Sequence, residues 1–571
     1  MTDSTKKMRV ADYIANFLLE NGVEDIFMLT GNGSMYLNDA IGKSGINFYC
    51  ARNEAAAPMM AEAYARVKGS LGAVCVTSGP GSTNAIPGLA EAWVDSAPIL
   101  VLSGQVQRNH TTNLIDIDGI RSFGTQEIDI IPLVKPMTKY AAMVEEEDSI
   151  KFHLQKAVYL ATTGRPGPVW LDIPMDIQYA LIDPDKLDGY VPTANYSKPN
   201  MSDSDIQKVV ESLLKAKRPL ILAGQGVRQA GAVEEIKEFV ECANIPIIFS
   251  RLGQDLIPHS HKLTFGQVGI KGVKYSADIM KQADLILAVG SRMSVQVVGQ
   301  NFDAFSQDAK VIMVDIEKAE LSKPGVHIDL KIHADALEFL LKTKSNLQGV
   351  KLPSWNNWVE KCRLLADSKP ILSSVSTEDP IDLYHFMSRL DAVAGSKNIF
   401  VTDAGSNYYI GGQVLQFNKG QREITSGCFA AMGLSIPLAI GSSIADKESQ
   451  ILAVTGDGSL ELNVQELKTM SHYNLNIKLF VINNGGYVSM RNWQDGYFEG
   501  RRIESEDETG TGTLDLLKIA SAFDLKHERI EKSAEIDSKL TEILKFAGPL
   551  FVEVVCTHNQ QIFEPVKDFS S

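Results

Sequence analysis

Residues 456–459 read Gly-Asp-Gly-Ser directly after the apolar segment 451–454, and Asn484 follows a second apolar segment, residues 477–482. Both segments have the composition of buried β-strands. An Asp between two glycines at a strand end can hold a hard cation while bare backbone N–H groups meet a phosphate, and an Asn 27 positions after Asp457 can complete the coordination shell. The spacing therefore fits a metal-bridged diphosphate. A Gly-Asp-Gly turn before an ordinary helix is the alternative interpretation.

The length and composition indicate a protein of several globular domains. At ~100–200 residues per domain, 571 residues predict two to four domains, of which three is the natural number. Charged residues make up 22% and hydrophobic residues 44%, and no apolar run approaches the ~20 residues that span a membrane. The polar residues 1–8 carry no apolar signal segment, so we expect a cytoplasmic protein.

Net charge and cysteine spacing exclude several classes of partner and site. The formal charge of −15 disfavours nucleic acid and anionic membranes, because both require a cationic face. It leaves room for an anionic cofactor bound by a local group of backbone N–H groups. The six cysteines lie far apart without a CxxC pair, which argues against a disulfide framework or a thiolate metal site.

Strand and helix patterns alternate along the chain. In the first third, strand-like segments at 26–29, 46–51, 73–77 and 98–103 are separated by helical patterns. The same alternation returns in the middle and last thirds, on either side of polar linkers. Alternation at this spacing predicts α/β domains built on doubly wound parallel sheets. We expect three of them, at residues 1–185, 195–350 and 375–560.

Three motifs in the first domain resemble one known family. Glu54 lies in the sequence RNEAAAPMMAEAYAR, and residues 77–105 and 164–174 read TSGPGSTNAIPGLAEAWVDSAPILVLSGQ and GRPGPVWLDIP. All three resemble the pyrimidine-binding domain of the acetolactate synthase group of thiamine diphosphate enzymes. Residues 456–484 likewise resemble the Mg²⁺ and thiamine diphosphate motif of that family. The resemblance implies a pyrimidine-binding, a central flavin-type and a diphosphate-binding domain, in that order.

The resemblance also implies roles for individual residues. Mg²⁺ would be bound by the side chains of Asp457 and Asn484 and by the backbone carbonyl of Gly486. Glu54 would activate the cofactor through its pyrimidine nitrogen, since a buried carboxyl group there favours the reactive tautomer. Met432 would prop the cofactor in its bent conformation; as an alternative, it is an ordinary core residue. The remaining residues implied to contact thiamine diphosphate are Asn84, Gly405, Ser406, Asn407, Gly456, Gly458 and Ser459.

The central third resembles the domain that binds a flavin dinucleotide in several members of the group. Arg292 and Asp315 fall at the matching strand ends, and residues 265–269 resemble the flavin loop. The likeness weakens after Arg292, where relatives often show Asp-Asp-Arg and this chain has Ser-Val-Gln at 294–296. We expect FAD here. An empty Rossmann-like spacer is the alternative, because a lone Gly-x-Gly at 224–226 is a weak signal.

The resemblance implies a carboligase that takes pyruvate or a similar 2-keto acid, releases CO₂ and transfers the two-carbon unit to a ketone. Decarboxylases of the superfamily that release an aldehyde carry an adjacent His pair, and none of the ten histidines here has a His neighbour. Gln126 matches a Gln near the donor adduct, and Trp493 keeps its place in the substrate pocket. The cofactor would lie between two subunits, which implies a homodimer or homotetramer.

The acceptor pocket departs from the synthases. Thr125 replaces a common Phe, and Gly485-Gly486-Tyr487 replaces the usual residues after the metal Asn. Losing an aromatic wall enlarges a pocket, which a small keto acid does not need. We therefore expect a nucleotide-linked keto deoxysugar as acceptor. Acetolactate synthesis from two keto acids is the second hypothesis, and a catalytically inactive cofactor-binding scaffold is the third.

Overall fold

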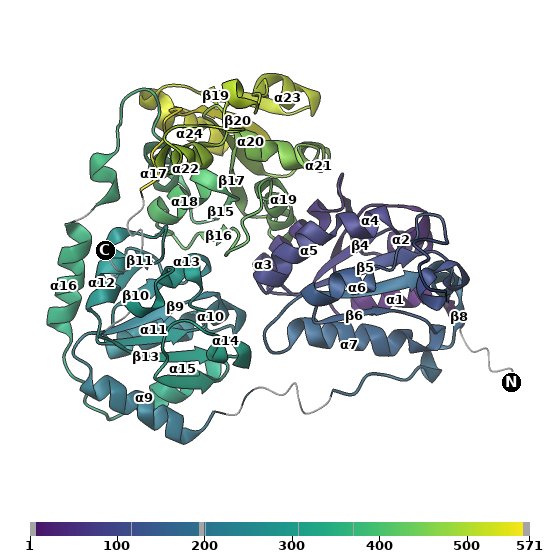
Figure 1. The fold of residues 1–571 in the computed structure, drawn as a ribbon, viewed down its shortest axis with the longest axis horizontal. Coiled ribbons are helices and arrows are strands. Elements are labelled where there is room, and N and C mark those ends of the chain that lie inside the picture. Colours follow the sequence, from purple (N-terminus) through teal and green to yellow (C-terminus); the bar gives the residue numbers. More distant parts are fainter. Residues whose placement is uncertain are drawn as a thin grey trace.

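The computed structural model describes residues 7–115, 117–192, 199, 201–305, 308–368 and 370–563. These residues form three six-stranded sheets, each within its own domain, and every strand pair in them is parallel. Figure 1 shows the three domains as separate lobes with helices packed against their sheets. The prediction of three doubly wound parallel sheets is confirmed. Most of the polar segment 1–8, and part of the linker expected between 185 and 195, lie outside the described residues.

The first sheet has the strand order β3-β2-β4-β5-β7-β6. Its central strands β4 and β5 are completely buried and mostly apolar, as expected for a sheet covered on both faces. A short antiparallel pair, β1 and β8, ties the start of this domain to its end. The strands are β1 Met8–Arg9, β2 Asp25–Met28, β3 Asn47–Cys50, β4 Gly72–Val76, β5 Ile99–Gln105, β6 Tyr140–Met143, β7 Val169–Pro174 and β8 Leu181–Ile182. The helices are α1 Val10–Glu20, α2 Met35–Ser44, α3 Ala56–Lys68, α4 Pro80–Asn84, α5 Ile86–Val94, α6 Ile131–Val134, α7 Ile150–Thr162 and α8 Met175–Tyr179.

The second sheet has the order β11-β10-β9-β12-β13-β14 and a hydrophobic core of its own. The strands are β9 Pro219–Ala223, β10 Ile247–Phe249, β11 Thr264–Gln267, β12 Leu285–Val289, β13 Lys310–Asp315 and β14 Leu330–His333. The helices are α9 Asp203–Lys215, α10 Gln225–Gln229, α11 Val233–Ala243, α12 Lys274–Gln282, α13 Val295–Val298, α14 Lys318–Ser322, α15 Ala336–Asn346 and α16 Asn356–Asp367.

The third sheet has the order β16-β15-β17-β18-β20-β19. The strands are β15 Asn398–Thr402, β16 Arg422–Ile424, β17 Gln450–Gly456, β18 Ile477–Asn483, β19 Lys526–Ile530 and β20 Leu550–Val555. The helices are α17 Leu383–Val393, α18 Gly405–Val414, α19 Ser435–Ala445, α20 Asp457–Leu460, α21 Glu466–His472, α22 Val488–Tyr497, α23 Leu516–Ala522 and α24 Ile536–Lys545.

Helices α3 and α19 join the first and third domains into one hydrophobic core. Ten consecutive residues at the start of each interface helix, 56–65 in α3 and 435–444 in α19, are buried. The helices approach so closely that a Cβ atom built on Gly441 would lie 2.0 Å from the Met60 carbonyl oxygen. Figure 1 shows this contact between the two lobes. It places the segment before α3, which carries Glu54, against the third domain.

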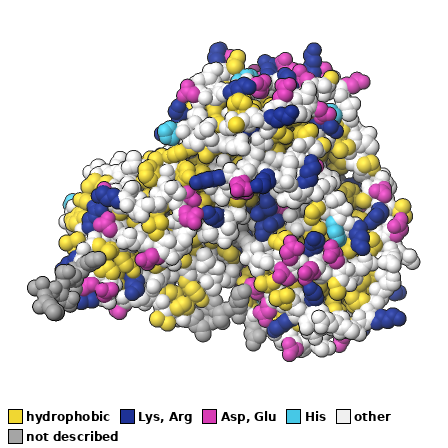
Figure 2. Space-filling view, turned by 180° about the vertical axis from the view of Figure 1, so that it is seen from behind, with side chains coloured by type: hydrophobic (Ala, Val, Ile, Leu, Met, Phe, Trp, Pro, Cys, Tyr) yellow, Lys and Arg dark blue, Asp and Glu magenta, His cyan; other side chains and the backbone are white. Residues whose placement is uncertain are grey.

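The surface carries charges of both signs. On the face shown in Figure 2, basic and acidic side chains are intermixed over the domains rather than gathered into one basic patch. Within the described residues, no helix is both long and apolar enough to cross a bilayer.

Gly441→Ala tests the helix contact. A methyl group at 2.0 Å from a backbone oxygen cannot be accommodated unless the helices move apart, so the variant should lose about 1–3 kcal/mol of stability. Differential scanning fluorimetry should show a lower apparent unfolding temperature. Gly42→Ala in α2 is the matched control, because nothing lies within 4 Å of its Cβ position, and it should be neutral or stabilising by up to about 1 kcal/mol. Equal unfolding temperatures for the two variants would contradict the contact.

Candidate functional site

Three neighbouring strands of the third sheet end in the polar residues of the candidate site. Asp403 follows β15, Asp457 follows β17 and Asn484 follows β18. Strands β15, β17 and β18 are adjacent and in parallel register, so their carboxyl ends lie side by side. The strand order reverses between β15 and β17, which is where open α/β sheets bind ligands.

The Asp457 carboxylate is oriented by backbone N–H groups. Its Oδ2 accepts from the N–H groups of Asn484 at 3.1 Å and Gly486 at 3.0 Å, and its Oδ1 accepts from the Gly458 N–H at 2.8 Å. The Oδ1 atom of Asn484 is buried and has no hydrogen-bond partner among the described residues. A buried acceptor without a donor is costly unless another group satisfies it. The carboxylate and this amide oxygen therefore form an oxygen-donor set that fits Mg²⁺.

The donor set relies on oxygen atoms alone. Within the described part of the chain, no group of three His, Cys, Asp or Glu side chains could hold a metal ion. Gly486, the third expected ligand, has a φ of +109°, which glycine adopts without strain, and its carbonyl accepts from the Val488 N–H at 3.2 Å. The backbone after Asn484 thus turns sharply around the Asp457 carboxylate.

The two glycines flanking Asp457 differ in their surroundings. A Cβ on Gly458 would lie 2.1 Å from the Tyr487 ring, so only glycine fits beneath that ring. At Gly456, the nearest atom to a Cβ would be 3.9 Å away, which leaves open space beside the strand end. Tyr487 is one of the residues by which this chain departs from the synthases. Its ring therefore packs on the turn at 456–458 that carries Asp457.

Asp403 is a site residue that the sequence analysis does not single out, although it follows an apolar strand just as Asp457 does. It is fully buried, and its carboxylate accepts hydrogen bonds from Asn407 Nδ2 at 3.0 Å, Ser459 Oγ at 2.8 Å and Thr455 Oγ1 at 2.8 Å. Burial raises the pKa of the Asp403 carboxyl, and these hydrogen bonds oppose that rise. Two side chains expected to contact the cofactor, those of Asn407 and Ser459, are thus held by Asp403. The backbone N–H groups at the start of α18, at Gly405 and Ser406, remain available to an anion.

Met432 lies in the segment between β16 and α19, beside the turn that follows β17. The N–H of the following residue, Gly433, donates to Ser459 Oγ at 3.0 Å, and its carbonyl accepts from Asn463 Nδ2 at 2.9 Å. Asn463 Nδ2 also lies 3.9 Å from Met59 Sδ in α3. Met432 is half-buried, in a segment that is bonded to the turn after β17 and lies near α3 of the first domain.

Glu54 and Asn84 meet on the first domain. Asn84 Nδ2 donates to Glu54 Oε2 at 2.8 Å, and the Glu54 side chain is half-buried. The segment before Glu54 is bonded to the third domain, because the Arg52 N–H donates to Glu466 Oε1 at 2.8 Å. Burial raises the pKa of Glu466 to about 7. The expected pyrimidine-activating carboxyl is thus anchored by a contact between domains.

Gln126 and Trp493 are not brought together within one chain. Gln126 is exposed with a φ of +59°, and its carbonyl oxygen would lie 2.2 Å from a Cβ on Gly79 in the loop before α4. Trp493 in α22 lines a large cavity between the domains and is 49% exposed. That cavity is not lined by Glu54, Gln126 or Met432.

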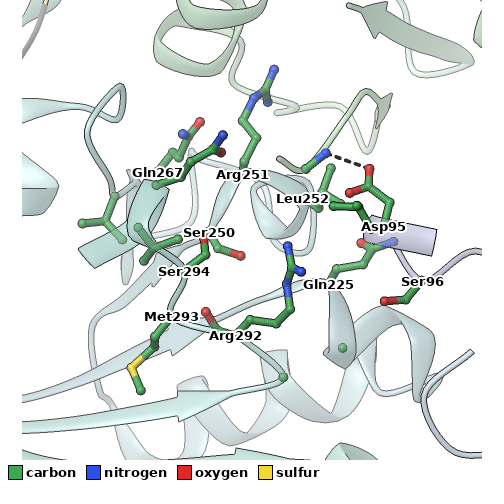
Figure 3. A pocket seen from close by; sticks show the side chains of 18 of the residues that line it. Asp95, Ser96, Gln225, Ser250, Arg251, Leu252, Gln267, Arg292, Met293 and Ser294 are labelled. Atoms are coloured by element: carbon green, nitrogen blue, oxygen red, sulfur yellow. Dashed lines mark hydrogen bonds between the residues drawn. The ribbon is translucent and has the colours of Figure 1, made fainter. Parts of the chain in front are cut away.

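The cavity has a volume of about 670 Å³, within the usual range for cofactor sites. Arg292 and Asp315 line it, as the flavin expectation requires, and burial raises the pKa of Asp315 to about 6. Figure 3 shows Arg292 extending into the cavity among residues of the central domain and Asp95 of the first. Two buried oxygen atoms of its lining, Gln267 Oε1 and Ser291 Oγ, have no hydrogen-bond partner among the described residues. These positive and polar groups fit a dinucleotide.

The glycines of the central domain form a close backbone crossing at the cavity wall. A Cβ on Gly226 would lie 2.7 Å from the Gly290 Cα, and one on Gly224 would lie 2.3 Å from the Gly290 carbonyl oxygen. Gly224 follows β9 and Gly290 follows β12, where the strand order of this sheet reverses. The Gly-x-Gly at 224–226 is therefore required by packing at a ligand-binding position.

Comparison with known proteins gives consistent matches along the chain. Residues 8–133 match the N-terminal TPP binding domain of thiamine pyrophosphate enzymes, residues 206–342 match their central domain and residues 403–554 match their C-terminal TPP binding domain. The chain is 32% identical over 565 residues to a probable acetolactate synthase large subunit of Methanocaldococcus jannaschii, covering 96% of this chain and 92% of that protein. It is 30% identical over 571 residues to the acetolactate synthase isozyme 3 large subunit of Escherichia coli, covering 97% and 96%. The acetolactate synthase large subunit of Lactococcus lactis is 32% identical over 555 residues, covering 95% and 92%.

Asp457→Ala should abolish Mg²⁺-dependent binding of thiamine diphosphate, because the diphosphate would face the strand ends without a bridging cation. Isothermal titration with and without Mg²⁺ measures this. Asp515→Ala, which removes an exposed N-terminal cap of α23 in the same domain, should bind as the wild type does. Equal cofactor affinity of Asp457→Ala with and without Mg²⁺, close to the wild-type value, would place the metal elsewhere.

Proposed function

This chain belongs to the thiamine pyrophosphate enzymes, in their acetolactate synthase-like group, and from that premise we propose that it decarboxylates pyruvate and joins the two-carbon unit to a second 2-keto acid. The observation that carries the proposal is the oxygen set of Asp457 and Asn484, next to the Met432 segment. Relatives that resemble the chain over nearly its whole length, and that are named acetolactate synthases, support the same reaction.

Each proposed role follows from the position of a side chain. Thiamine diphosphate, when bound, supplies the carbanion that attacks the keto acid and takes up the charge left by CO₂. Asp457 and Asn484 would hold the Mg²⁺ that carries its diphosphate, and Met432 would support its rings. Glu54 would hold a proton on its carboxyl group for the pyrimidine ring, and its hydrogen bond from Asn84 leaves Oε1 available.

The choice of acceptor rests on the relatives and on the position of Tyr487. The sequence analysis favours a nucleotide-linked keto deoxysugar, partly because residues 485–487 depart from the synthases. In the structure, the Tyr487 ring packs on Gly458, so this substitution contributes to the packing of the Gly-Asp-Gly turn at 456–458. The exposed Thr125 beside Gln126 is the observation that keeps the keto sugar as second candidate. We propose acetolactate synthesis as the main activity.

The activity is tested with ¹³C-labelled pyruvate offered alone, with other 2-keto acids and with nucleotide-linked keto sugars. Mass spectrometry should find acetolactate with the highest kcat/KM. Glu54→Gln is the matched inactive variant, because an amide cannot share a proton as a carboxyl does, and its rate should fall about 10²–10⁴-fold.

A higher kcat/KM for a branched-sugar product would reverse the order of the two acceptors. No product from any acceptor, together with tight Mg²⁺-dependent cofactor binding, would favour the inactive scaffold.

For the central cavity we propose FAD. Arg292, Asp315 and the unpartnered oxygens of Gln267 and Ser291 support a dinucleotide. The purified protein should be yellow, and denaturation should release the flavin unchanged by turnover. Gly226→Val, which fills the backbone crossing, should yield colourless protein, whereas Gly42→Ala in α2, with open space at its Cβ position, should stay yellow. A colourless, fully active wild type that gains nothing from added FAD would contradict this proposal.

We also propose a homodimer or homotetramer with the active site completed between subunits. Gln126 and Trp493 are both expected near the substrate, but within this chain Trp493 lines the large cavity and the exposed Gln126 does not. Large apolar side chains are exposed beside each of them, Phe123 at 58% and Tyr497 at 73%. Such side chains are usual at protein interfaces. A fully active monomer in analytical ultracentrifugation would contradict the assembly.

A further inference from the structure

Residues 425–433 form a loop of the third domain between β16 and α19, and side chains of the first and central domains hydrogen-bond to it. From the first domain, Arg66 Nη1 donates to the Thr425 carbonyl at 2.8 Å, and Asp95 Oδ2 accepts from the Gly427 N–H at 2.7 Å. From the central domain, Gln296 Nε2 donates to the Cys428 carbonyl at 3.2 Å. The loop ends in Met432 and Gly433, and the Gly433 N–H donates to Ser459 Oγ in the turn after β17.

Buried charges surround the loop contact. Arg66 Nη1 lies 3.0 Å from Glu62 Oε1 and 3.7 Å from Asp95 Oδ2, and all three side chains are at most 5% exposed. Glu91 is also fully buried, facing Ser426 and Ala431 of the loop, and burial raises its pKa to about 7. Two buried carboxyl groups, those of Glu62 and Asp95, share one guanidinium, and Glu91 adds a third buried carboxyl group beside the loop. Burying several charges around one counter-charge is costly.

The shape of the loop fits the Asp95 side chain closely. A Cβ on Gly427 would lie 2.7 Å both from Asp95 Oδ1 and from Leu252 Cδ1. Asp95, Leu252 and Gly427 all line the large cavity, and Figure 3 draws the hydrogen bond to Asp95 at its edge. Ala430 has a φ of +52°, a conformation that a residue with a Cβ adopts only when its surroundings impose it.

We propose that Asp95 is a positioning residue that clamps residues 425–433 as a common wall between the large cavity and Met432. The charge-assisted hydrogen bond to the Gly427 N–H fixes the start of the loop. Arg66 fixes both Asp95 and the Thr425 carbonyl, so the two contacts act together. Releasing this clamp frees the backbone that leads to Met432.

A purely structural role for the buried charges predicts a different result. If Asp95 served only the stability of the α3–α5 interface, its removal would weaken helices α3, α5 and α19 together. A clamp predicts instead a change confined to residues 425–433, in which four residues separate Gly427 from Met432. Hydrogen–deuterium exchange read by mass spectrometry distinguishes these results, and it needs neither bound cofactor nor activity.

In Asp95→Ala, peptides covering 425–433 should exchange about ten- to hundredfold faster than in the wild type, because a hydrogen bond to a charged group is worth about 1.5–3 kcal/mol. Peptides of α19 should be unchanged. Asp95→Asn, which keeps an acceptor oxygen, should restore most of the protection. Asp446→Ala is the matched control, since Asp446 bonds the turn at 448–449 after α19 and does not touch the loop.

Unchanged exchange of 425–433 in Asp95→Ala would overturn the proposal, as would equal loss of protection in α3, α5 and α19. If Asp95→Ala does not fold, Gly427→Ala probes the same contact from the loop, because its methyl group displaces Asp95. Wild-type exchange of the loop in that variant would also overturn it.

The kinetic readout rests on the proposed function. Asp95→Ala should lower kcat by more than tenfold while the Mg²⁺-dependent affinity for thiamine diphosphate and the KM for pyruvate change little, because the metal turn is untouched. Faster loop exchange with unchanged kcat would overturn the link to Met432. If the proposed function itself is wrong, the wild type will form no product. The exchange experiment still tests the clamp in that case, because it does not depend on activity.

Discussion

The packing of α3 against α19 is the constraint on which the rest of the structure depends. Because the Met60 carbonyl and Gly441 leave no room for a side chain, the two helices can meet only at one height and one angle. That contact merges the cores of the first and third domains, although residues 68 and 435, where α3 ends and α19 begins, lie 367 positions apart in the chain. Glu54 immediately precedes α3 and the Met432 loop immediately precedes α19, so the same packing sets the positions of both.

The central and third sheets place their candidate ligand-binding residues by the same geometry. In a parallel doubly wound sheet the carboxyl ends of the strands lie on one edge, and a crevice opens where the strand order reverses. In the third sheet this crevice holds Asp403 and Asp457, and in the central sheet it holds Gly224 and Gly290. Buried Asp403 then organises the crevice, since it occupies the side chains of Asn407 and Ser459 and leaves backbone N–H groups to face a ligand.

Buried ion pairs connect the domains around the large cavity. Arg251 of the central domain reaches Glu423 of the third, with Nη2 at 2.6 Å from Oε1, and Arg66 of the first reaches the loop after β16. Replacing one partner of such a pair strands the other without its counter-charge, which costs more than the pair contributes. These pairs therefore restrain the relative positions of the domains, and the loop 425–433 lies close to them.

The sequence by itself determined the fold class, the order of the domains and the family, because apolar strand periods and glycine-rich turns are local signals. It also singled out Asp457, Asn484 and Glu54. Each comes shortly after a strand-like segment, the first two in one motif and Glu54 in another. Only the tertiary structure decided what those residues touch. Asp403 and Asp95 look like ordinary acids in the sequence, and their partners lie 52 and 332 positions away. The Gly-x-Gly at 224–226 is a weak signal in the sequence, and only the structure shows that both glycines are needed because Gly290 packs against them. Tyr487 turned from a pocket residue into a metal-turn residue because Gly458 lies beneath its ring, a contact between chain segments that no local pattern encodes.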